Sequence, residues 1–398
     1  MSEPISNITA RKTLATCGVA HLLHDGLHDA LYVLLPIWAH MFGLSLVQVG
    51  ILKAAYSGAM ALFQVPAGIL AERFGERRLL AVGTVITGVA YMALGAVGGF
   101  AGLAVMLILA GMGAGVQHPL ASTLVARAYA EGGQRGALGI YNFSGDLGKM
   151  ALPAAAALIA GAIGWQTSVM AAGVLGAVTG VAIFAILRRL GAGAARPALL
   201  PADKIAAPRG GWGIRNPPAF ATLSAINIVD TAVIYGFLTF LPFLLMEKGA
   251  ALETIGLALA LTFGGGAAGK FLCGVLAERI GIIRTANISI IAKGVCILAL
   301  LWLPLWTALA LLPLLGAALN GTSSVLYATV AEFVDPNRHS RAFGLFYTLG
   351  MASGAVSPII FGVVSDRAGV SMALAIIGLA ALFTVPFCLL LRRSLALR

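Results

Sequence analysis

The sequence predicts an all-α membrane protein whose twelve transmembrane helices form two repeated halves of six. Its composition, its apolar runs and an internal repeat all point to this fold. Of the 398 residues, 60% are hydrophobic and only 10% are charged. A soluble domain carries about 25% charged residues, so this chain cannot cover a surface in water and needs lipid around it. The 50 glycines fit this environment, because small residues let membrane helices approach closely.

The spans follow from the apolar runs, since a helix needs about 20 mostly apolar residues to cross a bilayer. We expect them at 14–39, 47–71, 79–98, 101–126, 137–160, 165–187, 219–246, 253–277, 286–304, 306–331, 342–365 and 371–391. The first span lacks the cleavage site of a signal peptide and should remain in the mature protein. A proline-rich connection predicts a linker at 188–218, between an N-terminal half at 1–187 and a C-terminal half at 219–398.

The basic residues predict the orientation of the spans. The formal net charge is +11, and 20 of the 26 Lys and Arg residues lie at the two termini or in the even-numbered connections. The odd-numbered connections hold only Lys248 and Arg367. Because positive charge stays in the cytoplasm, we expect an integral protein of the cytoplasmic (inner) membrane with both termini cytoplasmic. We find no nucleic-acid motif and expect no nucleic-acid partner.

An internal repeat relates the two halves. The segment Gly68–Gly75 (GILAERFG) recurs as Gly274–Gly281 (GVLAERIG) at an offset of 206 residues. Other pairs keep this register to within one residue: Leu35 with Leu241, Pro36 with Pro242, Gly145 with Gly350, and Pro153 with Pro358. Six spans precede the linker, so both halves cross the membrane in the same orientation. Two such halves, related by an axis along the membrane normal, resemble the architecture of the major facilitator transporters.

The loop between the second and third spans also resembles the signature loop of the major facilitator superfamily. It reads Gly-x-x-x-Glu-Arg-x-Gly-Glu-Arg-Arg over residues 68–78, with Glu72 where the family usually has Asp. The resemblance implies a cytoplasmic gate made by this loop and its repeat, with these residues: Gly68, Glu72, Arg73, Gly75, Arg77, Glu278 and Arg279. A positive-inside anchor is the alternative. The fourth span has no Arg before Arg127, which argues against antiport by the family's usual route.

Within the superfamily, the chain looks most like the fosmidomycin-resistance group of exporters. Four short motifs carry this resemblance: His21-x-x-x-Asp25, Leu34-Leu35-Pro36, Gly113-x-x-x-x-His118-Pro119 and Gly145-Asp146-Leu147-Gly148. The expected direction of transport, export, rests on this resemblance alone.

The first span carries a high density of ionisable groups. His21, His24, Asp25, His28 and Asp29 recur at steps of three and four residues and cover one broad helix face. A charge at mid-membrane costs roughly 2.5–3.5 kcal/mol, so it usually faces a cavity or a partner. We interpret four of these groups, with one in the seventh span, as proton-coupling residues: Asp25, Asp29, His21, His24 and Asp230. A transition-metal site and a structural hydrogen-bonded network are the alternatives.

Polar residues in other spans predict the substrate site. The family resemblance places the first, fourth, seventh and tenth helices around a central cavity. Residues on these spans and on the fifth are the expected substrate contacts: His28, His118, Gln117, Asp146, Lys149, Asn227, Tyr235, Asn320, Ser324 and Tyr327. A self-neutralising pair of Asp146 and Lys149 is the alternative for those two. Three lysines nearer the ends of their spans are expected to snorkel: Lys53, Lys270 and Lys293.

These patterns favour proton-coupled secondary transport of a small organic solute, with efflux by proton antiport as the leading hypothesis. Uptake symport of an organic anion and export of a divalent metal are the alternatives. A membrane sensor or a lipid flippase on the same scaffold is the rival from another class. We find no nucleotide-binding or nucleophile motif and expect neither an enzyme nor a cofactor. The expected partners are the substrate, protons and the bilayer, and the protein is expected to be a monomer.

Overall fold

The computed structural model describes residues 7–195, 214–334 and 339–396, and these residues are almost entirely α-helical. The first seven helices are α1 (Asn7–Phe42), α2 (Leu46–Phe74), α3 (Glu76–Leu94), α4 (Phe100–Ala114), α5 (Gln117–Ala128), α6 (Gln134–Ile163) and α7 (Trp165–Arg189). The next seven are α8 (Pro217–Glu247), α9 (Leu252–Ile280), α10 (Ile282–Trp302), α11 (Leu305–Val330), α12 (His339–Ala368), α13 (Val370–Phe383) and α14 (Val385–Ala396). A 3-10 turn, η1 (Ala331–Phe333), follows α11.

Among the described residues, eleven helical segments are long enough and apolar enough to cross a membrane. The predicted first span, α1, is not one of the eleven, although it has 36 residues. Its histidines and aspartates lower its mean hydropathy, so α1 is less apolar than an ordinary membrane span.

Two predicted spans are each built from two helices. The fourth consists of α4 and α5, which are interrupted at Gly115 and Val116. The twelfth consists of α13 and α14, with Thr384 between them and Pro386 at the second position of α14. Proline has no N–H to donate, so it is tolerated in the first turn of a new helix but not inside a continuous one. The expected spans at 101–126 and 371–391 thus each contain an interruption, at Gly115–Val116 and at Thr384.

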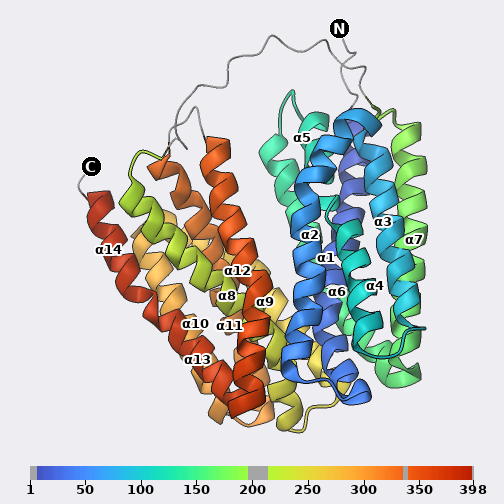
Figure 1. Ribbon diagram of the computed structural model, residues 1–398. Helices are drawn as coiled ribbons and strands as arrows, with labels where there is room; N and C mark the ends of the chain where they lie inside the picture. Colours follow the sequence, from blue (N-terminus) through green and yellow to red (C-terminus); the bar gives the residue numbers. More distant parts are fainter. Residues whose placement is uncertain (1–6, 196–213, 335–338, 397–398) are drawn as a thin grey trace. The chain divides into compact units, whose positions relative to one another are not determined.

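The chain divides into two compact units (Figure 1). The first comprises Met1–Phe42 and Ala55–Ile205, and the second comprises Gly43–Ala54 and Ala206–Arg398. The predicted domain boundaries stay a prediction, because residues 196–213 of the expected linker lie outside the described ranges.

The helix packing inside each unit follows the sequence repeat. In the first unit α1 packs along α6 and α3 along α7, and in the second unit α8 packs along α12 and α10 along α13. The turns after α2 and α9 also match. Gly75 and Gly281, which are 206 residues apart, have φ values of +84° and +91°, in a region that side chains rarely adopt. The repeat therefore extends from the sequence to individual backbone angles.

Candidate functional site

Small residues bring α1 and α6 into close contact and create the site between them. At Gly148, an added Cβ would overlap the backbone of Leu22. At Gly145, an added Cβ would lie 2.7 Å from Nε2 of His21 and 2.9 Å from Oδ2 of Asp25. The absence of a side chain at Gly145 therefore makes the space that the two ionisable groups occupy.

Asp25 is the centre of the cluster. Its Oδ2 lies 3.2 Å from Nζ of Lys149 on α6 and 3.3 Å from Nε2 of His21. Its Oδ1 lies 3.6 Å from Nε2 of His118 on α5. Asp25 and His21 are buried, whereas the side chains of Lys149 and His118 are 29% and 41% exposed. One buried carboxylate is thus shared by three groups that can carry positive charge, and two of the three are accessible.

The ring of His21 lies between the backbone of α6 and the carboxylate of Asp25. Its Nδ1 lies 2.8 Å from the backbone carbonyl oxygen of Tyr141. A carbonyl can only accept, so Nδ1 must donate. Its Nε2 lies 3.3 Å from Oδ2 of Asp25, so His21 connects the α6 backbone to the carboxylate.

Residues of α5 and α6 extend the cluster. The ring of His21 stacks on Tyr141 at 4.2 Å between ring centroids, and it meets the ring of His118 edge-on at 5.1 Å. Gln117 is buried and donates from Nε2 to the hydroxyl of Tyr141 at 3.1 Å, while its Oε1 has no hydrogen-bond partner among the described residues. The break between α4 and α5 places Gln117 and His118 in the first turn of α5. Sequence reasoning missed Tyr141, although it shares the i, i+4 face of α6 with Gly145.

The other ionisable residues of α1 point to different neighbours. His24 donates from Nε2 to the hydroxyl of Thr84 on α3 at 3.0 Å, because that hydroxyl itself donates to Leu80. His28 lies 2.6 Å from Asp29 and 3.3 Å from the hydroxyl of Ser57 on α2. The hydrogen bonds and ion pairs of these five residues thus run from α1 towards α6, α3 and α2. A coupling role for His24 and Asp29, and a substrate role for His28, stay predictions.

The second unit repeats this geometry with neutral residues. Gly350 on α12 is the repeat partner of Gly145, and its missing Cβ would lie 2.7 Å from Asn227 and 3.2 Å from Thr231. These two residues of α8 are 206 positions after His21 and Asp25. Asn227 donates to the carbonyl of Phe346 at 3.0 Å. The scaffold is therefore repeated, whereas the ionisable His21 and Asp25 are replaced by Asn227 and Thr231 in the second unit.

A buried ion pair joins three helices of the second unit. Lys293 on α10 donates to Oδ1 of Asp230 on α8, and Ser323 on α11 donates to Oδ2 at 3.0 Å. Lys293 is 1% exposed and Lys53 is 0% exposed, so our expectation that these two lysines snorkel is wrong. Asp230 occupies the repeat position of His24, which bonds to α3 in the first unit. The proton-coupling role of Asp230 remains a prediction.

The remaining substrate candidates of the second unit contact different neighbours. Tyr327 stacks on Tyr347 at 4.5 Å between ring centroids. Asn320 packs on Gly266 of α9, and Tyr235 packs beside Gly354 of α12. The side chain of Ser324 lies outside the described part of the chain. Asp146 of α6 is buried, and the ion pair that the structure gives Lys149 is with Asp25.

The predicted gate loop has an ion pair that the sequence analysis did not identify. Glu76, buried in the first turn of α3, pairs with Arg127 in the last turn of α5. The N–H of Arg77 donates to the carbonyl of Gly193 at 3.1 Å. Glu72 and Arg73 are exposed, as are their repeats Glu278 and Arg279. The loop is thus anchored within its own unit, and its latch role stays a prediction.

The metal alternative can be examined at the same cluster. His21, Asp25 and His118 each offer a ligand atom, and these atoms lie within 4.8 Å of one another. Nζ of Lys149, however, lies 3.2 Å from Oδ2 of the same Asp25. A lysine ammonium cannot act as a ligand and repels a cation, so the donor set fits a metal poorly.

Helices of membrane-spanning length, an internal repeat and a buried ionisable cluster together define a secondary transporter. The chain belongs to the Major Facilitator Superfamily, whose sequence profile matches residues 17–250 and 223–396. This superfamily consists of transporters, so the chain is a transporter and not an enzyme.

Three curated relatives illustrate the range of the family. The chain is 28% identical to the "Probable sulfoacetate transporter SauU" of Cupriavidus necator, over 88% of each chain. It is 24% identical to the "Fosmidomycin resistance protein" of Escherichia coli, over 93% of this chain and 92% of the relative. It is 23% identical to the "Hexuronate transporter" of Bacillus subtilis, over 86% and 84%.

Solved structures agree on the fold. A bacterial homologue of the human lysosomal transporter Spinster matches with a TM-score of 0.82, at 16% identity over 99% of this chain and 98% of that one. A mutant of the peptide transporter POT matches with a TM-score of 0.80, at 16% identity over 96% and 94%. The predicted fold class and superfamily are therefore confirmed.

Proposed function

We propose that this transporter carries a small organic anion together with a proton, with Asp25 as the proton site and Lys149 and His118 as the anion contacts. The observation that supports the proposal is the sharing of Asp25 by Lys149, His21 and His118. Further parts of the proposal are an inner-membrane location, cytoplasmic termini and a monomeric state.

The charge balance of the cluster would couple anion binding to proton binding. While Asp25 is ionised, it neutralises Lys149 at 3.2 Å. A proton on Asp25 removes this counter-ion and leaves Lys149 and His118, both partly exposed, with a net positive charge for an anion. Proton binding therefore strengthens anion binding, and by linkage the anion strengthens proton binding. Two ligands that favour each other move together, so an inward proton gradient would drive uptake.

The names of several relatives support an organic anion. Sulfoacetate, hexuronate and 4-hydroxybenzoate appear in the names of three of them, and each of these compounds carries a carboxylate at neutral pH. The site offers a lysine and a histidine, which can pair with such a group.

Efflux by proton antiport, our leading hypothesis from the sequence, is the second candidate. The "Fosmidomycin resistance protein" and an "MFS-type efflux pump" of Mycolicibacterium smegmatis support it. Antiport requires the substrate and the proton to compete, as a cationic solute would compete for Asp25. Metal export is the third candidate, and Lys149 disfavours it.

The pH dependence of ligand binding separates these candidates. Purified protein would be screened against phosphonates, carboxylates, cationic drugs and divalent metals, because a bound ligand raises the melting temperature by mass action. We expect an organic anion to stabilise the protein more at pH 6 than at pH 8, and Asp25→Asn to bind it equally at both. Glu131→Gln, on an exposed loop, is the control and should behave as wild type. A cation whose binding strengthens as pH rises would support antiport, and a metal whose effect is lost in His118→Ala would support metal export.

A further inference from the structure

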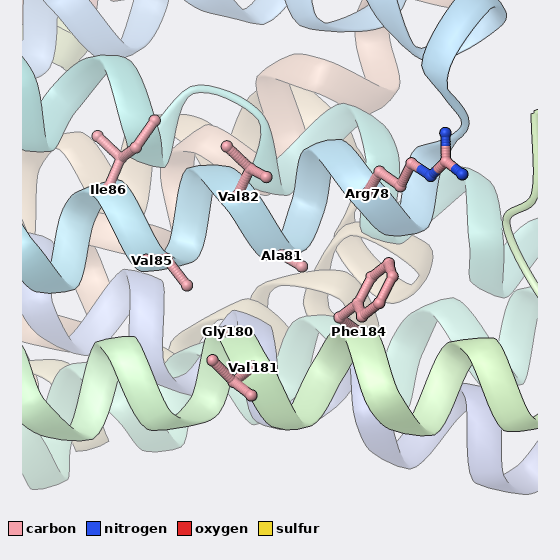
Figure 2. Close-up of a pocket in the computed structure, with 8 residues that line it drawn as sticks. All are labelled: Arg78, Ala81, Val82, Val85, Ile86, Gly180, Val181 and Phe184. Carbon is pink, nitrogen blue, oxygen red and sulfur yellow. The ribbon is translucent and has the colours of Figure 1, made fainter.

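An apolar groove lies between α3 and α7 on the outside of the first unit (Figure 2). Its volume is about 440 Å³. Gly180 forms its floor, because a side chain there would come within 2.7 Å of Val85 and 2.9 Å of the carbonyl oxygen of Ala81. Val82 and Val181 form its rims and are 54% and 63% exposed. Both helices are membrane spans, so the groove is open to the acyl chains of the bilayer.

One end of the groove is cationic. Figure 2 shows Arg78 beyond Ala81 and Phe184, at the end of the row of apolar side chains. On α7, Arg188 follows Phe184 by four residues and therefore lies on the same helix face, one turn further towards this end. The N–H of Arg77 donates to Gly193, which confirms that the start of α3 lies beside the end of α7. Arg78 and Arg188 are both exposed.

We propose that this groove binds an anionic phospholipid, with an acyl chain along the valines and the phosphate between Arg78 and Arg188. From Arg78 to Ile86 the groove follows eight residues of α3, which is about 12 Å and accommodates much of an acyl chain. A second copy of this chain is a poorer occupant. Copies in one membrane share their orientation, so a two-fold interface here would bring the arginines of both copies to the same level.

Native mass spectrometry of the full-length protein in detergent tests the proposal. The protein would be mixed with phosphatidylglycerol or with phosphatidylcholine that has the same acyl chains, and the bound lipid counted. A basic residue near an anionic lipid surface contributes a roughly fivefold preference. We therefore expect wild type to prefer phosphatidylglycerol, and Arg78→Gln or Arg188→Gln each to reduce the preference about fivefold.

Two matched variants show whether the groove itself is responsible. Arg189→Gln removes the same charge one residue further on, about 100° around the helix, and should keep the preference. Val181→Trp fills the groove from its exposed rim and should reduce the binding of both lipids. Equal binding of the two lipids to wild type would overturn the proposal, as would equal losses in Arg188→Gln and Arg189→Gln. Displacement of the lipid by free glycerol phosphate, or a dimer that Val181→Trp abolishes, would also overturn it.

Discussion

Asp25 and Asp29 occupy successive turns of α1, yet their surroundings differ. Lys149, His21 and His118 lie around Asp25, whereas Asp29 accepts a hydrogen bond from its sequence neighbour His28. A carboxylate that pairs alternately with a cation and with a proton can couple a proton gradient to substrate transport. This contrast makes Asp25 the first choice for the coupling residue.

Asp25→Asn should abolish gradient-driven transport but retain substrate binding and gradient-independent exchange. Asparagine resembles a permanently protonated carboxyl of nearly the same size, so the site can bind substrate but cannot release a proton. Reconstituted liposomes would measure uptake under a pH gradient and counterflow without one. If Asp25→Asn and Asp29→Asn both transport with an unchanged pH profile, coupling through α1 is wrong.

Lys149→Met should weaken anion binding by about tenfold to a hundredfold, the range expected for a hydrogen bond to a charged group. The loss should persist when Asp146→Asn is also present, because the ion pair of Lys149 is with Asp25. Isothermal titration of the two single variants and the double variant measures the coupling. A double variant that is milder than either single change would instead show that Lys149 and Asp146 neutralise each other.

Lys293→Met should destabilise the second unit by about 3–5 kcal/mol, because it leaves the buried carboxylate of Asp230 without its cation. The double change Asp230→Asn with Lys293→Met should be close to neutral, since it removes both charges. Thermal unfolding in detergent measures both effects. Equal destabilisation by the single and double variants would show that the lysine stem, and not the charge pair, contributes the stability.

At the scale of elements, the two halves use one packing scheme with different side chains. Gly145 leaves a space between α6 and α1, which holds His21 and Asp25. Gly350 leaves the corresponding space between α12 and α8, which holds Asn227 and Thr231. Glycine contacts are set by the distance between backbones, so they survive changes in the polar residues. The repeat therefore preserves the scaffold, while neutral residues stand at the positions of His21 and Asp25 in the second unit.

The two matched turns give a prediction at this scale. Gly75→Ala and Gly281→Ala place a side chain where φ is +84° and +91°, and each should cost about 1–3 kcal/mol. The cost should be larger at Gly75, where a Cβ would also meet the backbone of residues 193–195, than at Gly281, where nothing lies within 4 Å. Thermal unfolding of the two variants gives the comparison. A larger loss at Gly281 would contradict the anchoring of the α2–α3 turn by this segment.

At the scale of the whole molecule, the basic residues predict that both termini and the 188–218 linker are cytoplasmic. A cysteine introduced at Pro201 should therefore react with a membrane-permeant maleimide in intact cells, but not with an impermeant one. The four native cysteines are buried and give little background. Lysed cells provide the positive control. Labelling of intact cells by the impermeant reagent would contradict the predicted topology.

The sequence by itself determined the fold class and the repeat, because these depend on composition and on spacing along one chain, and the resemblance of the 68–78 loop to a known signature indicated the superfamily. It also identified His21, Asp25, His118 and Lys149 as candidates, since ionisable groups are conspicuous in apolar helices. Only the tertiary structure decided which of them meet. Lys149 is three residues from Asp146, yet its ion pair is with Asp25 on another helix. Lys293 lies in an apolar run that fits snorkelling, yet it pairs with Asp230. Partners on different helices are set by helix rotation and by glycine contacts, and neither can be read from the periodicity of a single helix.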